Sequence, residues 1–290
     1  RTLPVLIPKF ISMMQHADGK SKDGKQRHKE FSKSVLSEES GVNIYETNID
    51  PIKWDDNATQ AKKVIREDIK NVEGAALLHN VLTESECEQL VQVSEELGYT
   101  KALVTTSRGM VEDEMRTNKR VIWQTSVELL NKTVWQRIKE KVPDKISITG
   151  KNTFHSCGLN ERIRFYRYTG GERFAPHYDG AFFRNRSDIE RSFFTIIIYL
   201  NDDPERVGGE TSFFFRPKGL AKGSFKTTKI ETFHGRTTMG VNRVAPKTGA
   251  ALIFYHSHPL SPLHEGSMIA KGSKYVLRSD IMFRQEGYEK

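Results

Sequence analysis

The stretch Phe174-Ala175-Pro176-His177-Tyr178-Asp179-Gly180 decides how the rest of the chain is interpreted. On an extended segment, side chains two residues apart point to the same side, so His177 and Asp179 present an imidazole and a carboxylate together. These are two of the three ligands of a 2-His-1-carboxylate facial triad, which binds non-haem Fe(II) and leaves coordination positions open. Because His-x-Asp alone occurs by chance in many proteins, the prediction depends on a third ligand elsewhere in the chain.

The third ligand would be a histidine on a distant segment that the fold brings alongside. Residues 250–255 form an apolar run that predicts a buried strand, and His264 follows this run within Leu263-His264-Glu265-Gly266. His256 and His258 lie nearer to the same run. Taken alone, the residues leave these three histidines as alternatives.

The composition is that of a folded protein with a basic surface. The chain has 290 residues and a formal net charge of +8. This length is enough for one large domain or two small ones with a sizeable core. An ordinary soluble surface explains the charge, and we favour that interpretation over an acidic or nucleic-acid partner.

The cysteine content bears on the cellular compartment. Cys87 and Cys157 are the only two cysteines, and their spacing suggests neither a disulfide framework nor a metal clip. We therefore expect a reducing compartment, the cytoplasm or the nucleus, although a targeting signal could lie upstream of Arg1. The sequence contains no apolar run long enough to span a bilayer.

Charge and hydrophobic patterning divide the chain near residue 70. Residues 1–70 are predicted to form a basic, partly flexible N-terminal arm, because residues 15–40 are mainly polar and charged. A nucleic-acid-binding tail is the alternative for the basic run Lys20–Lys29, but no aromatic residue is interleaved in it for stacking. Residues 71–290 are predicted to form the folded domain.

Within that domain, the sequence predicts helices first and then many short strands. Thr83-x-x-Glu86 forms a capping box that opens a helix ending at Gly98, and a second helix is expected from Ser126 to Pro143. Short strands with Gly and Pro turns are expected from residue 160 onward. The expected strands cover residues 163–168, 193–200, 212–215, 250–255 and 275–284. The pattern predicts a mainly β protein with flanking helices, folded as a sandwich or barrel.

Several short motifs carry a family resemblance through their common order. They are Tyr168 with His177-Tyr178-Asp179, Tyr199-Leu200-Asn201, Gly208-Gly209-Glu210-Thr211, Leu263-His264-Glu265-Gly266 and Lys274-Tyr275. Residues 72–286 resemble the Fe(II)/2-oxoglutarate dioxygenase superfamily, specifically its prolyl 4-hydroxylase-like branch. The resemblance implies a double-stranded β-helix (jelly roll) with His177, Asp179 and His264 as metal ligands. It also implies that His256 is a neighbour of the site, since only His264 has the His-Glu-Gly context.

The resemblance further implies a cation that binds the far carboxylate of 2-oxoglutarate. Lys274 matches the position of that cation in the prolyl and lysyl hydroxylases, and Arg278, on the same strand face, is the alternative. Tyr168 and Tyr199 are expected to line the same pocket, as is Thr195, which shares the strand face of Tyr199. A core hydrogen bond for the tyrosines, or a solvent-facing position for either cation, is the simpler interpretation.

Few residues in the sequence indicate the substrate. Arg162 and Arg164 alternate with Tyr168 and are candidates for substrate contact, or else exterior charges. Phe174 is a further candidate, and it replaces a tyrosine that is common in some prolyl hydroxylases, which weakens the case for a prolyl target. Residues 105–119 and 213–243 are expected to be loops beside the site.

The expected function is that of a dioxygenase using Fe(II), 2-oxoglutarate and O₂, with ascorbate as an additional ligand suggested by the family. The expected reaction hydroxylates a residue of a protein or peptide, with prolyl as the default target, and releases succinate and CO₂. One alternative is oxidative demethylation of nucleic acid or protein. Another is a jelly-roll binding module without turnover.

Overall fold

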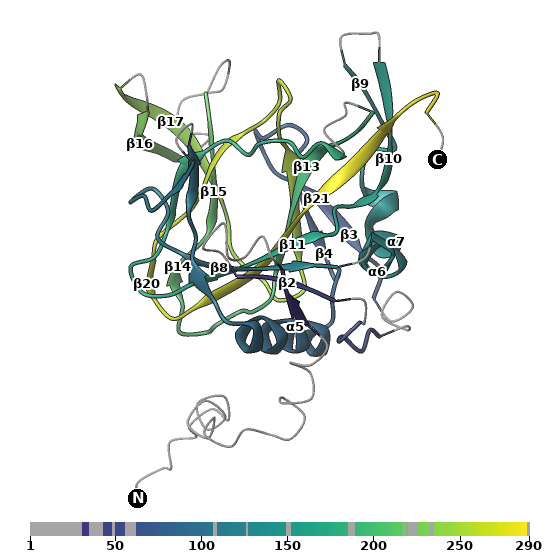
Figure 1. Cartoon of the computed structure of the whole chain (residues 1–290). Helices are drawn as coiled ribbons and strands as arrows, with labels where there is room; N and C mark the ends of the chain where they lie inside the picture. Colours follow the sequence, from purple (N-terminus) through teal and green to yellow (C-terminus); the bar gives the residue numbers. More distant parts are fainter. Residues whose placement is uncertain are drawn as a thin grey trace, which may run out of the picture.

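The computed structural model describes residues 31–34, 43–47, 50–55, 62–106, 109–125, 127–148, 152–184, 189–216, 219, 226–232 and 235–288. Within these residues, two antiparallel-rich β-sheets face each other and the helices lie outside them (Figure 1). This arrangement confirms the predicted mainly β architecture with flanking helices.

The larger sheet has twelve strands within the described part of the chain. Across the sheet, their order is β1 (Ser32–Lys33), β2 (Ile44–Glu46), β8 (Lys119–Gln124), β11 (Arg162–Tyr168), β21 (Lys274–Gln285), β13 (Glu190–Tyr199), β18 (Ala251–Tyr255), β4 (Ala76–His79) and β3 (Ile65–Asp68). Three further strands branch from this order: β10 (Asn152–Leu159) pairs with β21 and with β9 (Lys145–Ile148), and β5 (Thr100–Lys101) pairs with β8.

The smaller sheet has five strands in the described residues. Their order is β12 (Phe174–His177), β19 (Leu263–Gly266), β15 (Thr211–Phe215), β17 (Gly235–Val244) and β16 (Lys226–Thr232). Two short ribbons complete the β structure, β14 (Val207–Gly208) with β20 (Ile269–Lys271) and β6 (Val104–Thr106) with β7 (Gly109–Val111).

The chain alternates between the two sheets as it advances, and this alternation makes the fold a double-stranded β-helix. It passes from β11 in the larger sheet to β12 in the smaller one, then to β13, β15, β18, β19 and β21, changing sheet at each step apart from the β16–β17 hairpin. The predicted jelly roll is therefore confirmed. Strands that are distant in sequence are brought side by side in this way, as the two sheets in Figure 1 show.

The two faces of the larger sheet bury different kinds of side chain. The outer face packs against the helices through a large apolar cluster that includes Trp123, Phe165 and Leu277. The inner face, between the sheets, carries a second cluster with tyrosines, Tyr168 and Tyr199 among them. Because side chains alternate along a strand, each central strand supplies both a dry outer core and a more polar interior.

Helix α5 (Glu84–Leu97) is the predicted first helix and begins at the predicted capping box. Thr83 Oγ1 accepts from the Glu86 backbone N–H, and Glu86 accepts from the Thr83 backbone N–H. Leu90 and Leu97 on its buried face pack against the larger sheet. Gly98 ends the helix at φ 79°, a conformation that glycine adopts without strain.

The second predicted helix is interrupted. In place of one helix between residues 126 and 143, the structure has α6 (Val127–Lys132), α7 (Val134–Ile138) and the 3₁₀ turn η1 (Lys139–Lys141). The backbone of Thr133 leaves the helical region at φ −113° and ψ −89°. The apolar spacing of Leu130, Val134 and Ile138 survives the break, since all three are buried.

Part of the predicted N-terminal arm is ordered in the sheet. Ile44 to Glu46 add a parallel strand to β8, and Ile65 to Asp68 pair with β4. Most of residues 1–70 lie outside the described residues, including the basic run 20–29, so the division at residue 70 stays a prediction. None of the helices in the described residues is long and apolar enough to cross a membrane.

Candidate functional site

Three potential metal ligands converge at one end of the barrel. β12 and β19 are neighbours in the smaller sheet, and their register places His177 opposite His264. Asp179 follows β12 immediately, and one ligand atom from each of these three residues lies within 4.8 Å of the others. His177 Nε2 is 3.6 Å from Asp179 Oδ1, and His264 Nε2 is 3.6 Å from Asp179 Oδ2. The structure thus brings together all three residues predicted as ligands.

Hydrogen bonds fix which nitrogen of each imidazole faces the centre of this triad. His177 Nδ1 lies 2.8 Å from the Ala175 carbonyl, and His264 Nδ1 lies 3.2 Å from the Pro262 carbonyl. A carbonyl only accepts, so each Nδ1 carries the proton and each Nε2 keeps a lone pair. This tautomer is the one that a histidine metal ligand needs.

The charge states of the triad also fit a divalent metal. Burial, together with the nearby His177, lowers the pKa of His264 to about 4, so this imidazole is neutral at pH 7. Burial opposes ionisation of Asp179, but Arg278 and the two histidines hold the pKa of its carboxyl well below the usual range. Two imidazole nitrogens and one carboxylate are the donor set that suits Fe(II). The residues present therefore fit the metal.

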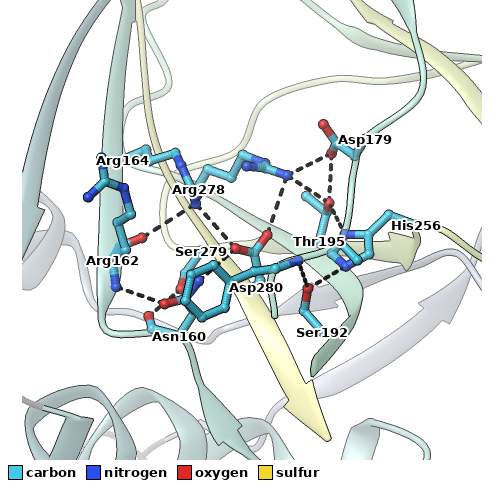
Figure 2. Close-up of polar contacts among 12 residues, drawn as sticks. Asn160, Arg162, Arg164, Asp179, Ser192, Thr195, His256, Arg278, Ser279 and Asp280 are labelled. Atoms are coloured by element: carbon cyan, nitrogen blue, oxygen red, sulfur yellow. Dashed lines mark hydrogen bonds and ion pairs between the residues drawn. The ribbon is translucent and has the colours of Figure 1, made fainter. Parts of the chain in front are cut away.

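Arg278 and Thr195 hold one oxygen of the Asp179 carboxylate (Figure 2). Thr195 Oγ1 donates to Asp179 Oδ2 at 2.6 Å, and Arg278 Nη2 lies 3.2 Å from the same oxygen. Both residues were expected in the 2-oxoglutarate pocket, Arg278 as the alternative anchor. In the structure they contact the candidate ligand Asp179 itself.

A buried polar network holds Thr195 and Arg278 in their contacts with Asp179. His256 bridges Ser192 and Thr195, with Nε2 2.7 Å from Ser192 Oγ and Nδ1 3.0 Å from Thr195 Oγ1. On the other side, Arg278 lies 3.4 Å from Asp280 Oδ1. Both ring nitrogens of His256 are thus engaged by hydroxyl groups (Figure 2), and His256 lies beside the triad, outside the group of three converging ligands.

A second group of polar side chains is buried between the sheets, around Lys274. Its Nζ is buried, donates to the Gly209 carbonyl at 2.7 Å, and lies 5.2 Å and 5.7 Å from the ring centres of Tyr168 and Tyr199. The Tyr199 hydroxyl is 2.9 Å from Thr211 Oγ1. Burial lowers the pKa of Lys274 to about 7, and Arg206 contributes to the lowering.

Strand register explains why these residues meet. β11 pairs with β21 so that Tyr168 lies opposite Lys274, and β13 pairs with β21 so that Tyr199 lies opposite Val276. Thr211 was not predicted as a site residue, although it belongs to the quoted Gly-Gly-Glu-Thr motif. Its position after two glycines at the start of a strand was the available signal, but only the fold shows that it faces Tyr199.

Of the residues predicted on the substrate side, Phe174 contacts the triad, and Arg164 and Arg162 contact other residues of the larger sheet. The Phe174 ring stacks on the His177 ring with centres 3.5 Å apart, and the guanidinium of Arg116 lies 4.3 Å from the centre of the Phe174 ring. Arg164 Nη1 lies 3.2 Å from Asp280, and Arg162 Nη1 donates to Gln124 at 3.3 Å. These arginines face the interior between the sheets.

An open cavity lies on the other side of Asp179. Its volume is about 570 Å³, and it is lined by Tyr178, Asp179, Ser257, His258, Pro259 and Ser261. Tyr178 is 64% exposed, so an aromatic ring stands at the mouth. His258, one of the three candidate third ligands, lines this cavity and stacks on Tyr255.

The two predicted loops contain strands. β6 and β7 form a short hairpin within residues 105–119, of which 107 and 108 lie outside the described residues. Within 213–243, β16 and β17 form a hairpin that extends the smaller sheet. The polarity of this segment, with residues such as Thr227 and Lys229, predicts a loop, but pairing with β17 makes it a strand.

Comparison with known proteins adds independent evidence. A family model for the 2OG-Fe(II) oxygenase superfamily matches residues 163–279. Probable prolyl 4-hydroxylase 10 of Arabidopsis thaliana is 28% identical over 209 residues, which cover 69% of this chain and 66% of the relative. Probable prolyl 4-hydroxylase 8 of the same plant is 29% identical over 211 residues with the same coverage. The chain thus spans just under two thirds of the length of these relatives.

Two solved structures are more distantly similar. A viral collagen prolyl hydroxylase from Paramecium Bursaria Chlorella virus-1, in complex with 2OG, gives a TM-score of 0.41 at 18% identity and covers 77% of this chain and 97% of its own. A prolyl hydroxylase from Trichoplax adhaerens, in complex with a hypoxia inducible factor peptide fragment, gives 0.44 at 14% identity, covering 78% and 86%. At these TM-scores the likeness by itself establishes neither fold nor function.

Proposed function

We propose that this chain, which matches the family model of the 2OG-Fe(II) oxygenase superfamily over residues 163–279, is a dioxygenase that uses Fe(II), 2-oxoglutarate and O₂ to hydroxylate a residue of a protein or peptide. The observation that carries the proposal is the convergence of His177, Asp179 and His264 at the barrel end, beside the buried cationic pocket of Lys274. A metal site alone would fit many functions. A metal site next to a cation enclosed by tyrosines is what a 2-oxo dicarboxylic acid requires.

His177, Asp179 and His264 would hold Fe(II) in this proposal. With 2-oxoglutarate and O₂, the bound metal supplies the oxidising chemistry that inserts one oxygen atom into a C–H bond and releases succinate and CO₂. The protein's part is to keep both imidazoles in the Nε2-lone-pair tautomer and the carboxylate ionised. Arg278 and Thr195 orient that carboxylate through its second oxygen.

Lys274 would bind the far carboxylate of 2-oxoglutarate. Its ammonium group is buried and has one hydrogen-bond acceptor, the Gly209 carbonyl, among the described residues, so it retains donors for an incoming carboxylate. The hydroxyl groups of Tyr168, Tyr199 and Thr211 add neutral polar contacts around it. The walls of this pocket come from both apolar and aromatic residues, which exclude water and strengthen the ion pair.

A protein or peptide is the substrate class that we propose. The curated relatives are named as probable prolyl 4-hydroxylases. The open cavity beside Asp179, with exposed Tyr178 at its mouth, could receive an extended segment. By analogy with the relatives, a prolyl residue remains the default target. Phe174, which stacks on the His177 ring, stands where some prolyl hydroxylases have a tyrosine, and this difference could change the target residue.

The proposal is tested by anaerobic loading with Fe(II), addition of 2-oxoglutarate and O₂, and measurement of succinate. We expect stoichiometric metal binding and succinate release, with one oxygen atom added to a target peptide in a proline-containing peptide panel. His264→Ala should abolish both, while His155→Ala, a half-exposed histidine on β10, should change neither. Absence of metal binding together with absence of succinate would refute the proposal.

The alternatives from the sequence are weaker. A binding module without turnover would not require the buried pocket of Lys274, whose burial is costly for a cation. Nucleic-acid demethylation would require phosphate contacts at the surface, and the basic run 20–29 that could make them lies outside the described residues.

A further inference from the structure

Five arginines gather on the inner face of the larger sheet, next to the triad. This arginine cluster consists of Arg116, Arg120, Arg162, Arg164 and Arg278. β8 pairs with β11 so that Arg120 lies opposite Tyr166, and β11 pairs with β21 so that Arg164 lies opposite Arg278. Arg116 reaches the same place from the segment before β8, because its guanidinium lies 4.7 Å from the Tyr166 ring centre.

The cluster has more positive charge than its surroundings neutralise. Asp280 contacts Arg164 and Arg278, and Asp179 contacts Arg278. Within the part of the chain that the structure describes, Arg116, Arg120 and Arg162 form no ion pair. Among the described residues, the five guanidinium groups thus form ion pairs with two carboxylates, Asp179 and Asp280, and Asp179 is the one that a metal would engage. Glu112, Asp113 and Glu114 line a cavity with Arg116 but form no ion pair with it.

Hydrogen bonding in the cluster is incomplete as well. Arg120 is 9% exposed, and its Nε has no hydrogen-bond partner among the described residues. The same is true of Arg116 Nη2 and Arg278 Nε. Buried donors without a partner are rare in native proteins, and a buried cation without a counter-charge is costly. The cluster is therefore built to receive an acceptor that carries negative charge.

The positive charge of the cluster lowers the pKa of Tyr166, the tyrosine at its centre. Burial would raise the pKa of Tyr166, but the guanidinium groups of Arg116, Arg278, Arg164 and Arg120 lower it to about 7. Even an ionised Tyr166 would supply a single negative charge. The cluster would keep an excess of positive charge in either state of the phenol.

The cluster contacts the triad at two points, so an anion bound in it would lie close to the reacting centre. Arg278 Nη2 lies 3.2 Å from Asp179 Oδ2. Arg116 lies over the Phe174 ring, which itself stacks on His177. Figure 2 shows the two contacts that connect the cluster to this region, Arg278 to Asp179 and Arg164 to Asp280.

We infer that the arginine cluster binds a carboxylate of the substrate, and that the substrate is a peptide segment with an acidic side chain close to the oxidised residue. The inference rests on the proposed function. 2-Oxoglutarate is a less suitable occupant, because Lys274 already offers a separate buried cation beside the rings of Tyr168 and Tyr199. Arginine suits the planar carboxylate through paired N–H donors, and several arginines favour an anion over a neutral polar group.

The inference is tested by binding, so that it does not depend on turnover. The full chain is loaded with Mn(II) in place of iron and with 2-oxoglutarate, and is titrated with peptide pairs that differ only by Glu or Gln at each position flanking a central proline. We expect that at one position the Glu peptide binds roughly tenfold or more tightly than its Gln partner. A third peptide with phosphoserine at that position distinguishes a general anion site from one fitted to a carboxylate.

Variants then test whether the arginine cluster is the cause of the preference for the Glu peptide. In the double variant Arg116→Gln, Arg162→Gln the advantage of the Glu peptide should fall below about twofold, and Arg116→Lys with Arg162→Lys should restore part of it. The double variant Lys139→Gln, Lys145→Gln, which removes two exposed charges on η1 and β9, is the charge-matched control and should preserve the advantage. Thermal unfolding of each variant checks that it folds, and the Lys pair keeps the test valid should the Gln pair fail to fold.

Two results would overturn the inference. One is equal binding of the Glu and Gln peptides at every position, and the other is a Glu preference that survives in the double Gln variant. Stronger binding of the phosphoserine peptide than of the Glu peptide, lost in the same variant, would replace the carboxylate by a phosphate and so contradict the stated class. A failure of the proposed function would appear separately, as absent succinate release from the iron-loaded protein.

Discussion

Lys274 gives the sharpest prediction, because its charge state at neutral pH is set by burial. Lowering the pKa of a lysine from 10.5 to about 7 corresponds to about 5 kcal/mol of preference for the neutral amine. A carboxylate of 2-oxoglutarate would reverse that preference by pairing with the ammonium ion. Binding of 2-oxoglutarate above pH 7 should therefore be accompanied by uptake of a proton at Lys274.

The affinity for 2-oxoglutarate follows from this proton uptake. Below pH 7 Lys274 is already charged, and the Kd should be nearly independent of pH. Above pH 7 the Kd should rise by up to about tenfold per pH unit, which amounts to about 2 kcal/mol between pH 7 and 8.5. Calorimetry of the Mn(II)-loaded protein in buffers of different ionisation enthalpy measures both quantities.

Lys274→Arg provides the matched comparison, since arginine keeps its proton throughout this range. Its Kd for 2-oxoglutarate should stay flat from pH 6 to 8.5, with no proton uptake. Stability without 2-oxoglutarate gives a second readout. The unfolded chain binds one more proton than the folded chain between pH 7 and 10.5, so stability should rise with pH across this window.

Tyr166 titrates in the same window, because its pKa is also about 7. The contribution of Lys274 is therefore the difference in slope between the wild-type protein and Lys274→Met. A wild-type Kd for 2-oxoglutarate that does not change between pH 7 and 8.5, or one that changes equally in Lys274→Arg, would refute the reasoning.

Three further predictions follow from the contacts around the site and the helices. Arg278→Gln should weaken Mn(II) binding roughly 10- to 100-fold by releasing the Asp179 carboxylate, and an unchanged affinity in a metal titration would contradict this role. His256→Gln should retain metal binding within about tenfold, because His256 contacts hydroxyl groups rather than the metal site; complete loss would make it a ligand. Arg137→Met should lower the free energy of unfolding by about 3–5 kcal/mol by leaving the buried carboxylate of Glu86 without its partner, and a urea titration showing a loss below about 1 kcal/mol would argue against that pair.

Local patterns in the sequence were enough to predict the strands that carry the site. The helix after Thr83 follows from a capping box, and the central strands β13 and β18 follow from continuous apolar runs. The convergence of His177, Asp179 and His264 followed from the order of several motifs, because neither histidine identifies its partner by itself. These features depend on residues that are close in sequence or on a recurring order of motifs.

Contacts that depend on strand register could not be predicted in the same way. Arg278 and Lys274 share a strand face, and nothing in their spacing shows that Lys274 meets Tyr168 while Arg278 meets Asp179. Arg120 and Arg116 precede the family motifs and became part of the interior only through the pairing of β8 with β11. One register shift would turn each of these side chains to the opposite face.

Edge and extension strands were missed for a related reason. β2 is short and β16 is polar, so their composition does not predict a strand. Each forms a strand because it pairs with a neighbour, β2 with β8 and β16 with β17. β16 lies at the edge of the smaller sheet and has one neighbour, so its side chains carry less of the apolar pattern that identifies a buried strand. β2 lies between β1 and β8, and its three residues are too few to show an alternating pattern.

The most direct test of the central claim is a crystal structure of the protein with Mn(II) and 2-oxoglutarate. We expect one metal ion bonded to His177, Asp179 and His264, with the far carboxylate of 2-oxoglutarate on Lys274. A metal ion that is bonded to fewer than all three residues, or a 2-oxoglutarate carboxylate bound away from Lys274, would contradict the account.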